Sequence, residues 1–175
     1  FRLILDDTLS YSCALFESPQ STLRDASLAK YERICRTMRL RPEHHVIEIG
    51  SGWGGFALHA ARRYGCRVTT TTISRQQYQY VAAAIRAAGL ESRITLLADD
   101  YRHLQGQYDR LISIEMIEAV GHEFLPAYFS QCSRLLKPDG EMLMQAITIP
   151  DRRYDQYRRS VDFIQRYVFP GGCLP

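Results

Sequence analysis

The stretch Val46-Ile-Glu-Ile-Gly-Ser-Gly-Trp-Gly-Gly55 decides the fold. An apolar, β-branched run enters a glycine-rich turn, and a helical pattern that begins near Phe56 follows the turn. Glycines let the backbone come close to a nucleotide, and the N-terminus of a helix supplies free N–H groups. The stretch therefore predicts a strand–turn–helix unit that binds a ligand containing a nucleoside.

Strand-like runs and helical patterns alternate along the rest of the chain. In Arg75–Ala88, for example, apolar side chains recur on one helical face, and Gly89 follows as a C-cap. A helix is expected from Thr22 to Arg39, and another opens at Pro150 with Tyr154, Tyr157, Val161 and Ile164 near one face. The predicted strands are Val46–Ile49, Arg67–Thr72, Ile94–Leu97, Asp109–Ile114 and Met142–Thr148. This order predicts an α/β fold, a Rossmann-like and mostly parallel sheet with helices on both faces.

Composition excludes several classes of protein. Of the 175 residues, 46% are hydrophobic and 23% are charged, and this balance excludes a disordered chain. No apolar run is long enough for a membrane helix. A net charge of +3 does not signal nucleic acid. The two lysines, Lys30 and Lys137, stand against twenty arginines, and we interpret this as genome composition.

The cysteines and histidines do not form a pattern that binds a metal or builds a disulfide framework. The five cysteines include no CxxC pair, and the histidines lack ligand spacing, so neither a metal site nor a disulfide framework is expected. Reduced thiols in a cytoplasmic protein fit best. The segment Phe1–Asp6 lacks the pattern of a signal peptide, and both ends indicate a piece of a longer protein. We expect an N-terminal arm and helix over residues 1–41 and a truncated catalytic core over residues 42–175.

The glycine pattern has two interpretations. Gly50, Gly52 and Gly55 match the dinucleotide fingerprint, but a site for NAD requires a carboxylate after the second strand, which here ends in threonines. Instead, Glu48 lies two residues before the first glycine. This arrangement resembles motif I of the class I S-adenosylmethionine methyltransferases, in which the acidic group lies near the amino-acid end of the ligand.

The ends of the other strands are expected to line the same crevice, because open α/β sheets bind ligands at the carboxyl edge. These ends are Thr72-Ile-Ser74, Asp99-Asp-Tyr101 and Ile114-Glu-Met-Ile-Glu118. Asp100 is suited to accept a hydrogen bond from an adenine amino group, and Tyr101 is suited to cover the ring. For each residue alone, a solvated loop position is the alternative.

Further motifs make the resemblance specific. The chain resembles the cyclopropane fatty acid synthases, which are related to the mycolic acid cyclopropane synthases, over nearly its whole length. The motifs that carry the resemblance are Tyr11-Ser-Cys13, Glu48-Ile-Gly-Ser-Gly-Trp-Gly-Gly55, Thr72-Ile-Ser-Arg-Gln-Gln77, Asp100-Tyr-Arg102, Glu118-Ala-Val-Gly121 and Phe169-Pro-Gly-Gly-Cys-Leu-Pro175.

The resemblance implies a site for S-adenosylmethionine. In that site Gln77 takes over part of the hydroxyl binding that a carboxylate performs in other methyltransferases. Tyr11 and Ser12 close over the cofactor; Gly50, Gly52 and Trp53 hold its methionine part, with Glu48 nearby; Thr72, Ile73 and Gln77 meet the ribose and adenine; Asp100, Tyr101 and Ile114 flank the adenine.

The resemblance also implies the chemistry. A cis double bond of a lipid acyl chain takes the methyl group, and a base then removes a proton so that a ring closes. In the family this base is a bound bicarbonate, and matching by motif assigns Cys13, Glu118 and the backbone of Ile147 to it. Gln145 stands where the bacterial pattern has His and cannot carry a proton. A later Tyr of the pattern is expected beyond Pro175.

Several alternatives stay open. Cys13 is alternatively a small buried hydrophobe, and Glu115 and Glu118 are alternatively a solvated face. The implied partners are unsaturated phospholipid acyl chains. A cluster of arginines has two interpretations, peripheral contact with an anionic membrane surface or a solvated helix face; its members are Arg152, Arg153, Arg158, Arg159 and Arg166. A methyl-branched product, methylation of a small amine and an inactive homologue are the alternative functions, and an NAD oxidoreductase is more remote.

Overall fold

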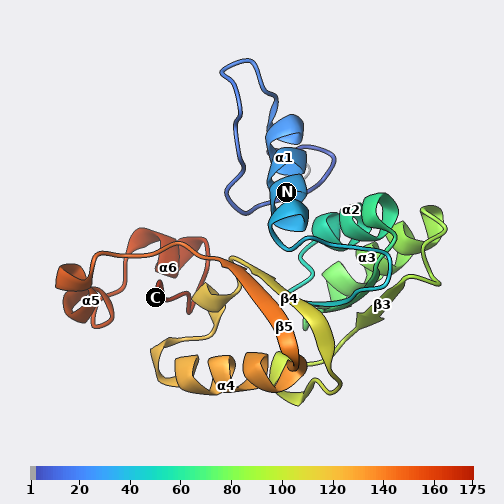
Figure 1. The fold of residues 1–175 in the computed structure, drawn as a ribbon. Coiled ribbons are helices and arrows are strands. Elements are labelled where there is room, and N and C mark those ends of the chain that lie inside the picture. Colours follow the sequence, from blue (N-terminus) through green and yellow to red (C-terminus); the bar gives the residue numbers. More distant parts are fainter. Residues whose placement is uncertain (1–2) are drawn as a thin grey trace.

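The computed structural model describes residues 3–175, so Phe1 and Arg2 of the segment examined for a signal peptide lie outside the described residues. Strands and α-helices alternate from β1 to β3, a short 3₁₀ turn leads from β3 to β4, and α4 lies between β4 and β5 (Figure 1). The helices are α1 Leu23–Thr37, α2 Gly55–Tyr64, α3 Arg75–Ala87, α4 Leu125–Leu135, α5 Asp151–Tyr157 and α6 Phe163–Tyr167. The strands are β1 His45–Ile49, β2 Arg67–Thr71, β3 Ile94–Leu97, β4 Tyr108–Ile114 and β5 Leu136–Gln145. Short 3₁₀ turns cover Tyr101–His103, Ile117–Ala119 and His122–Phe124.

The five strands form one sheet in the order β3-β2-β1-β4-β5, and all neighbours are parallel. The chain crosses from one side of β1 to the other between β3 and β4. In an open α/β sheet, a ligand crevice lies beyond the carboxyl ends of the strands at such a switch point. The predicted α/β fold with a parallel sheet is therefore confirmed.

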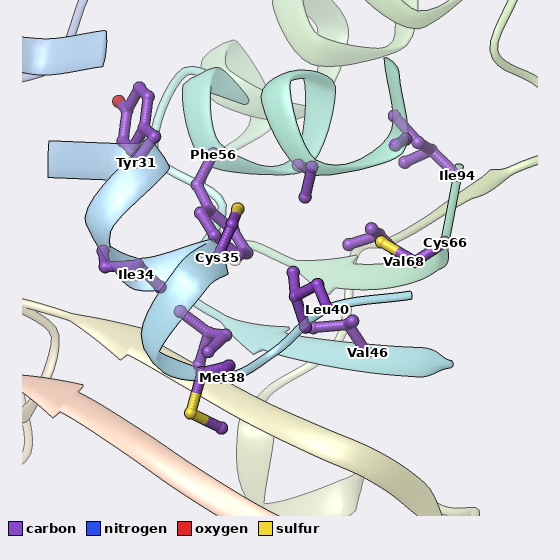
Figure 2. Packing of buried hydrophobic residues seen from close by; sticks show 14 of the residues in the cluster. Tyr31, Ile34, Cys35, Met38, Leu40, Val46, Phe56, Cys66, Val68 and Ile94 are labelled. Atoms are coloured by element: carbon purple, nitrogen blue, oxygen red, sulfur yellow. The ribbon is translucent and has the colours of Figure 1, made fainter. Parts of the chain in front are cut away.

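Two apolar cores lie on opposite faces of the sheet, because alternate side chains of the central strands point to opposite faces. Val46 and Ile112 pack with α1, α2 and α3 on one face, while Ile47 and Leu111 pack with α4 on the other. Figure 2 shows the first of these cores, in which side chains of α1 and α2 meet those of β1 and β2. Both faces are covered by helices, as parallel sheets require.

Local signals explain where the helices begin and end. Thr22 and Asp25 form a reciprocal capping box at the start of α1. The Ser74 side chain accepts a hydrogen bond from the amide of Gln77 and caps α3. Gly65 takes a left-handed conformation with φ +67° and ends α2. The boundaries predicted for α1 and α3 are therefore close to the observed ones.

The last strand differs from its prediction. Met142–Thr148 was expected, but β5 begins at Leu136 and ends at Gln145. Its partner β4 ends at Ile114, which pairs with Gln145, so residues beyond Gln145 have no strand to pair with. Pro138 is tolerated near the start because β5 lies at the sheet edge and its register shifts there. Ile147 consequently lies in a loop.

The C-terminal helix also differs from its prediction. A single helix after Pro150 was expected, whereas two short helices, α5 and α6, are observed. The Asp162 side chain accepts a hydrogen bond from the Gln165 amide and caps a new helix, which separates α6 from α5. Val161 is 73% exposed instead of packing on a common face. Among residues 3–175, no helix is long and apolar enough to cross a membrane.

Candidate functional site

A large cavity opens at the carboxyl edge of the sheet. It measures about 490 Å³ and lies beside the loop after β1, the start of α3 and the residues that follow β3 and β4. It is lined by Tyr11, Gly50, Gly52, Thr72, Ile73, Gln77, Asp100, Tyr101 and Ile114, all of which were predicted to hold a cofactor. Tertiary structure thus gathers strand ends that are far apart in the sequence into one hollow.

A second, smaller cavity of about 40 Å³ adjoins the glycine loop. Ser12, Glu48 and Trp53, the other residues predicted for the cofactor site, line this cavity. Tyr11, Gly50, Gly52 and Ile114 line both cavities, so the two hollows share a wall formed by the N-terminal arm, the glycine loop and the end of β4.

The glycine loop needs its glycines for close approach. Gly52 has φ +50°, a conformation in which most side chains are strained, and a Cβ atom there would lie 3.4 Å from Cε1 of Tyr11. Tyr11 in turn accepts a hydrogen bond of 3.3 Å from Nε2 of Gln77 at the start of α3. Tyr11 of the arm therefore contacts both the glycine loop, at Gly52, and the start of α3, at Gln77.

Glu48 lies at the base of the site and is only 3% exposed. Burial raises the pKa of its carboxyl from 4.5 to about 8, and a hydrogen bond from Thr70 opposes the rise. The Thr70 hydroxyl donates this bond to Oε2 over 2.6 Å. β2 thus contributes the hydroxyl that holds the buried Glu48 carboxyl group.

Two predicted contact residues already have partners in this structure. Asp100 accepts two hydrogen bonds from the Arg102 guanidinium, at 2.9 and 2.7 Å, and these bonds lower its pKa to about 2. Gln77 also accepts a hydrogen bond of 2.7 Å from the Thr72 hydroxyl. Both side chains are therefore held in fixed orientations at the cavity wall.

The residues matched to the base site fall into two hydrogen-bonded groups. In the first group, Oε1 of Glu115 accepts hydrogen bonds from the Cys13 amide, at 2.8 Å, and from Nε2 of Gln145, at 2.7 Å. Nε2 of Gln145 also donates to the Cys13 carbonyl over 3.2 Å. The arm is thus joined to the ends of β4 and β5.

In the second group, Oε1 of Glu118 accepts a hydrogen bond of 2.6 Å from the Ile147 amide. Oε2 of Glu118 is buried, and no donor among residues 3–175 reaches it. The Glu118 carbonyl accepts a hydrogen bond of 2.7 Å from the Cys173 amide, so the C-terminal Pro-Gly-Gly-Cys-Leu-Pro segment packs against this residue. The solvated-face alternative is therefore wrong for Glu115 and Glu118.

Sequence reasoning did not assign a role to Glu115 or Lys30. Glu115 lies directly after β4 with φ +47°, and its position at a strand end was the signal that could have identified it. Lys30 is 4% exposed and donates hydrogen bonds to the arm, although a lysine in a helix normally indicates a solvated surface. No cluster of His, Cys, Asp and Glu side chains suited to a metal ion occurs in the described part of the chain.

Comparison with known proteins relates this chain to lipid-modifying enzymes. The family described as mycolic acid cyclopropane synthetase matches residues 1–175. Tuberculostearic acid methyltransferase UfaA1 of Mycobacterium tuberculosis is 39% identical over 182 residues, which cover 100% of this chain and 42% of the relative. Cyclopropane-fatty-acyl-phospholipid synthase of Escherichia coli is 39% identical over 176 residues, which cover 100% of this chain and 44% of the relative.

Solved structures agree with these matches. The crystal structure of mycolic acid cyclopropane synthase CmaA1 complexed with SAH and CTAB superposes with a TM-score of 0.91 at 32% identity, covering 99% of this chain and 64% of that one. The chain therefore spans less than half the length of the two curated relatives and about two thirds of the solved one. Since the family match extends over every residue, the chain belongs to the mycolic acid cyclopropane synthetase family.

Proposed function

We propose that the intact protein transfers a methylene unit from S-adenosylmethionine to the cis double bond of unsaturated phospholipid acyl chains, forming cyclopropane fatty acids. Family membership and the phospholipid synthase of E. coli support this substrate class. The observation that carries the proposal is the Glu118 carboxylate. Its second oxygen is buried without a donor among residues 3–175, and the next residue, Ala119, lines the large cavity.

The linings of the two cavities support a site for S-adenosylmethionine. The large one has room for a nucleoside between the ends of β2, β3 and β4, and the small one adjoins the glycine loop and Glu48. We propose that Gly50, Gly52, Trp53 and Glu48 face the methionine part, that Thr72, Ile73, Gln77, Asp100, Tyr101 and Ile114 surround the nucleoside, and that Tyr11 and Ser12 cover the whole. When bound, the cofactor supplies an activated methyl group.

Glu118 is our candidate for the base site, together with Cys13, Gln145 and Ile147. A buried carboxylate oxygen without a donor is costly, so Oε2 indicates a place for a ligand that donates a hydrogen bond. The hydroxyl of a bicarbonate ion suits this oxygen. The Gln145 amide has two N–H donors, and these already bond to Glu115 and the Cys13 carbonyl. We therefore propose that Gln145 orients the Cys13 segment beside the base site.

Simple methyl transfer to an acyl chain is the second candidate function, because the relative from M. tuberculosis is named a methyltransferase. To separate the candidates, the full-length protein is incubated with methyl-labelled S-adenosylmethionine and vesicles of unsaturated phospholipid. Mass spectrometry and proton NMR of the acyl chains should show a gain of one CH₂, loss of the olefin and cyclopropane proton signals. A branched chain without ring signals would favour the second candidate, and labelling of a small amine instead of lipid would refute both.

The substitution Glu118→Gln tests the base site. It retains the side-chain volume but replaces one carboxylate oxygen with an N–H donor, so turnover should fall at least about a hundredfold. Cofactor affinity should remain close to that of the wild type. The exposed Glu123, five residues along the chain, provides the matched control Glu123→Gln, which should leave turnover unchanged. Loss of cofactor binding in Glu118→Gln would contradict the assignment, and binding without turnover in the wild type would indicate an inactive homologue.

The segment of α5 and α6 is our candidate for contact with lipid. It carries exposed apolar side chains among its arginines, and in Figure 1 both helices lie away from the sheet. The exposed apolar residues are Val161, Phe163, Ile164, Tyr167, Val168 and Phe169. Near an anionic surface each basic residue contributes about 1 kcal/mol of attraction. We propose that the intact protein is cytoplasmic and contacts lipid at the membrane surface through this segment.

Vesicle sedimentation tests this contact. Vesicles that contain anionic phospholipid should retain more protein than zwitterionic vesicles, and raising the salt concentration should release it. Arg152→Gln combined with Arg159→Gln should weaken retention without changing cofactor affinity. Equal retention by both kinds of vesicle would contradict the electrostatic contribution.

A further inference from the structure

We infer that Lys30 is a positioning residue, which holds the arm Ser10-Tyr-Ser-Cys13 over the cofactor cavities through the two serines. The inference rests on the proposed function, since it assigns the arm to the same cofactor site. Lys30 itself lines neither cavity, so any effect on the cofactor has to pass through the residues that it contacts.

The surroundings of Lys30 are unusual for a lysine. It lies in α1 and is 4% exposed, and no carboxylate within residues 3–175 forms an ion pair with its ammonium group. Burial lowers its pKa, and the strongest opposing influence is the charge of Glu115. Burying an ammonium group is costly unless hydrogen bonds compensate, so its partners are informative.

Those partners lie in the arm. Nζ of Lys30 donates to Oγ of Ser12 over 2.6 Å, to Oγ of Ser10 over 2.8 Å and to the Ser12 carbonyl over 3.5 Å. The ammonium also lies 5.0 Å from the ring centroid of Tyr31. An ammonium has three N–H donors, so the three oxygen atoms can satisfy it. Hydrogen bonds to a charged donor are stronger than neutral ones, so this contact fixes the arm.

The arm is also held from its other end. Cys13 bonds to Glu115 through its amide and to Gln145 through its carbonyl. Between these anchors Tyr11 lies across the glycine loop and lines both cavities. Figure 1 shows the N-terminal chain running beside α1, the helix that carries Lys30. The arm is therefore held at two places, by Lys30 through Ser10 and Ser12 and by Glu115 through Cys13.

The substitution Lys30→Met tests the inference in the full-length protein, because Met retains an unbranched side chain and removes the charge. Amide hydrogen exchange of the ligand-free protein should accelerate about tenfold in residues 8–13 and remain unchanged in β1 and β4. The dissociation constant for S-adenosylmethionine, measured by calorimetry, should rise about tenfold, as loss of a charged hydrogen bond predicts.

The other lysine provides the matched control. Lys137 bonds to Asp109 over 2.6 Å near the amino ends of β4 and β5, opposite the site, so Lys137→Met should change neither measurement. In a double-mutant cycle, Lys30→Met should add little once Ser10 and Ser12 are alanine, because the lysine acts through them. Should Lys30→Met not fold, Ser12→Ala is used alone, with faster exchange in residues 8–13 again expected.

Distinct results separate the two proposals. If the wild type does not bind S-adenosylmethionine, the proposed function fails, and exchange in the arm still decides the role of Lys30. Unchanged exchange in residues 8–13 would overturn the inference, whatever the cofactor affinity. Uniformly faster exchange throughout the core would also overturn it, since Lys30 would then support the fold as a whole rather than the arm.

Discussion

Replacing Glu48 with Gln should make the stability of the ligand-free protein much less dependent on pH. Glu48 is 3% exposed, and burial raises the pKa of its carboxyl from 4.5 to about 8. Between these values the folded protein holds a proton that the unfolded chain has lost. The free energy of unfolding therefore falls as the pH rises through this range. Below pH 4.5 Glu48 is protonated in both states and lowers the stability little.

The magnitude follows from the two pKa values. Their difference, multiplied by about 1.4 kcal/mol per pH unit, gives a limiting loss of about 5 kcal/mol, of which about 4 kcal/mol is reached at pH 8. About 3 kcal/mol of this loss should occur by pH 7. The amide of Glu48→Gln does not titrate, and its oxygen can still accept the hydrogen bond from Thr70. The free energy of unfolding of the variant should therefore increase relative to that of the wild type as the pH rises.

Urea unfolding of the full-length protein, followed by circular dichroism at half-unit steps from pH 5 to pH 8, measures this difference. Other titrating groups are common to both proteins, so the difference between the two stability curves isolates Glu48. Glu91→Gln, a substitution at an exposed position, is the matched control. Curves for wild type and Glu48→Gln that stay parallel over the whole range would refute the reasoning.

Two further substitutions test the packing around the site. Gly55→Ala should destabilise the protein by about 1–3 kcal/mol, because the added Cβ atom would lie 3.0 Å from Cζ of the buried Tyr31, whose ring would have to shift. An unchanged denaturation midpoint would contradict this. Tyr128→Phe should cost about 1–3 kcal/mol, because it removes the 2.7 Å hydrogen bond to the Ser113 hydroxyl in a fully buried place. Thermal unfolding checks it, and an equal or higher melting temperature would refute the stated cost.

Local sequence signals predicted much of the fold. The glycine turn after Val46–Ile49 and the alternation of strands and helices depend on neighbouring residues, so they are visible in a single sequence. The same is true of the caps at Thr22 and Ser74. One error lies where a long-range partner decides, because β5 ends at Gln145 where its partner β4 ends opposite it. The other error, the single helix expected after Pro150, overlooked the local cap at Asp162.

The sequence by itself determined which strand ends would meet beside the two cavities, because parallel strands bring their carboxyl ends to one edge. Only the tertiary structure decided the pairing of side chains beside those cavities. Glu115 meets Cys13 from 102 residues away and Gln145 from 30, and Lys30 meets the arm through its serines. Such contacts depend on the relative positions of a helix, an arm and two strand ends, and no local pattern records them. Burial of Glu48 and Lys30 likewise follows from packing, which sets their desolvation and hence their pKa values.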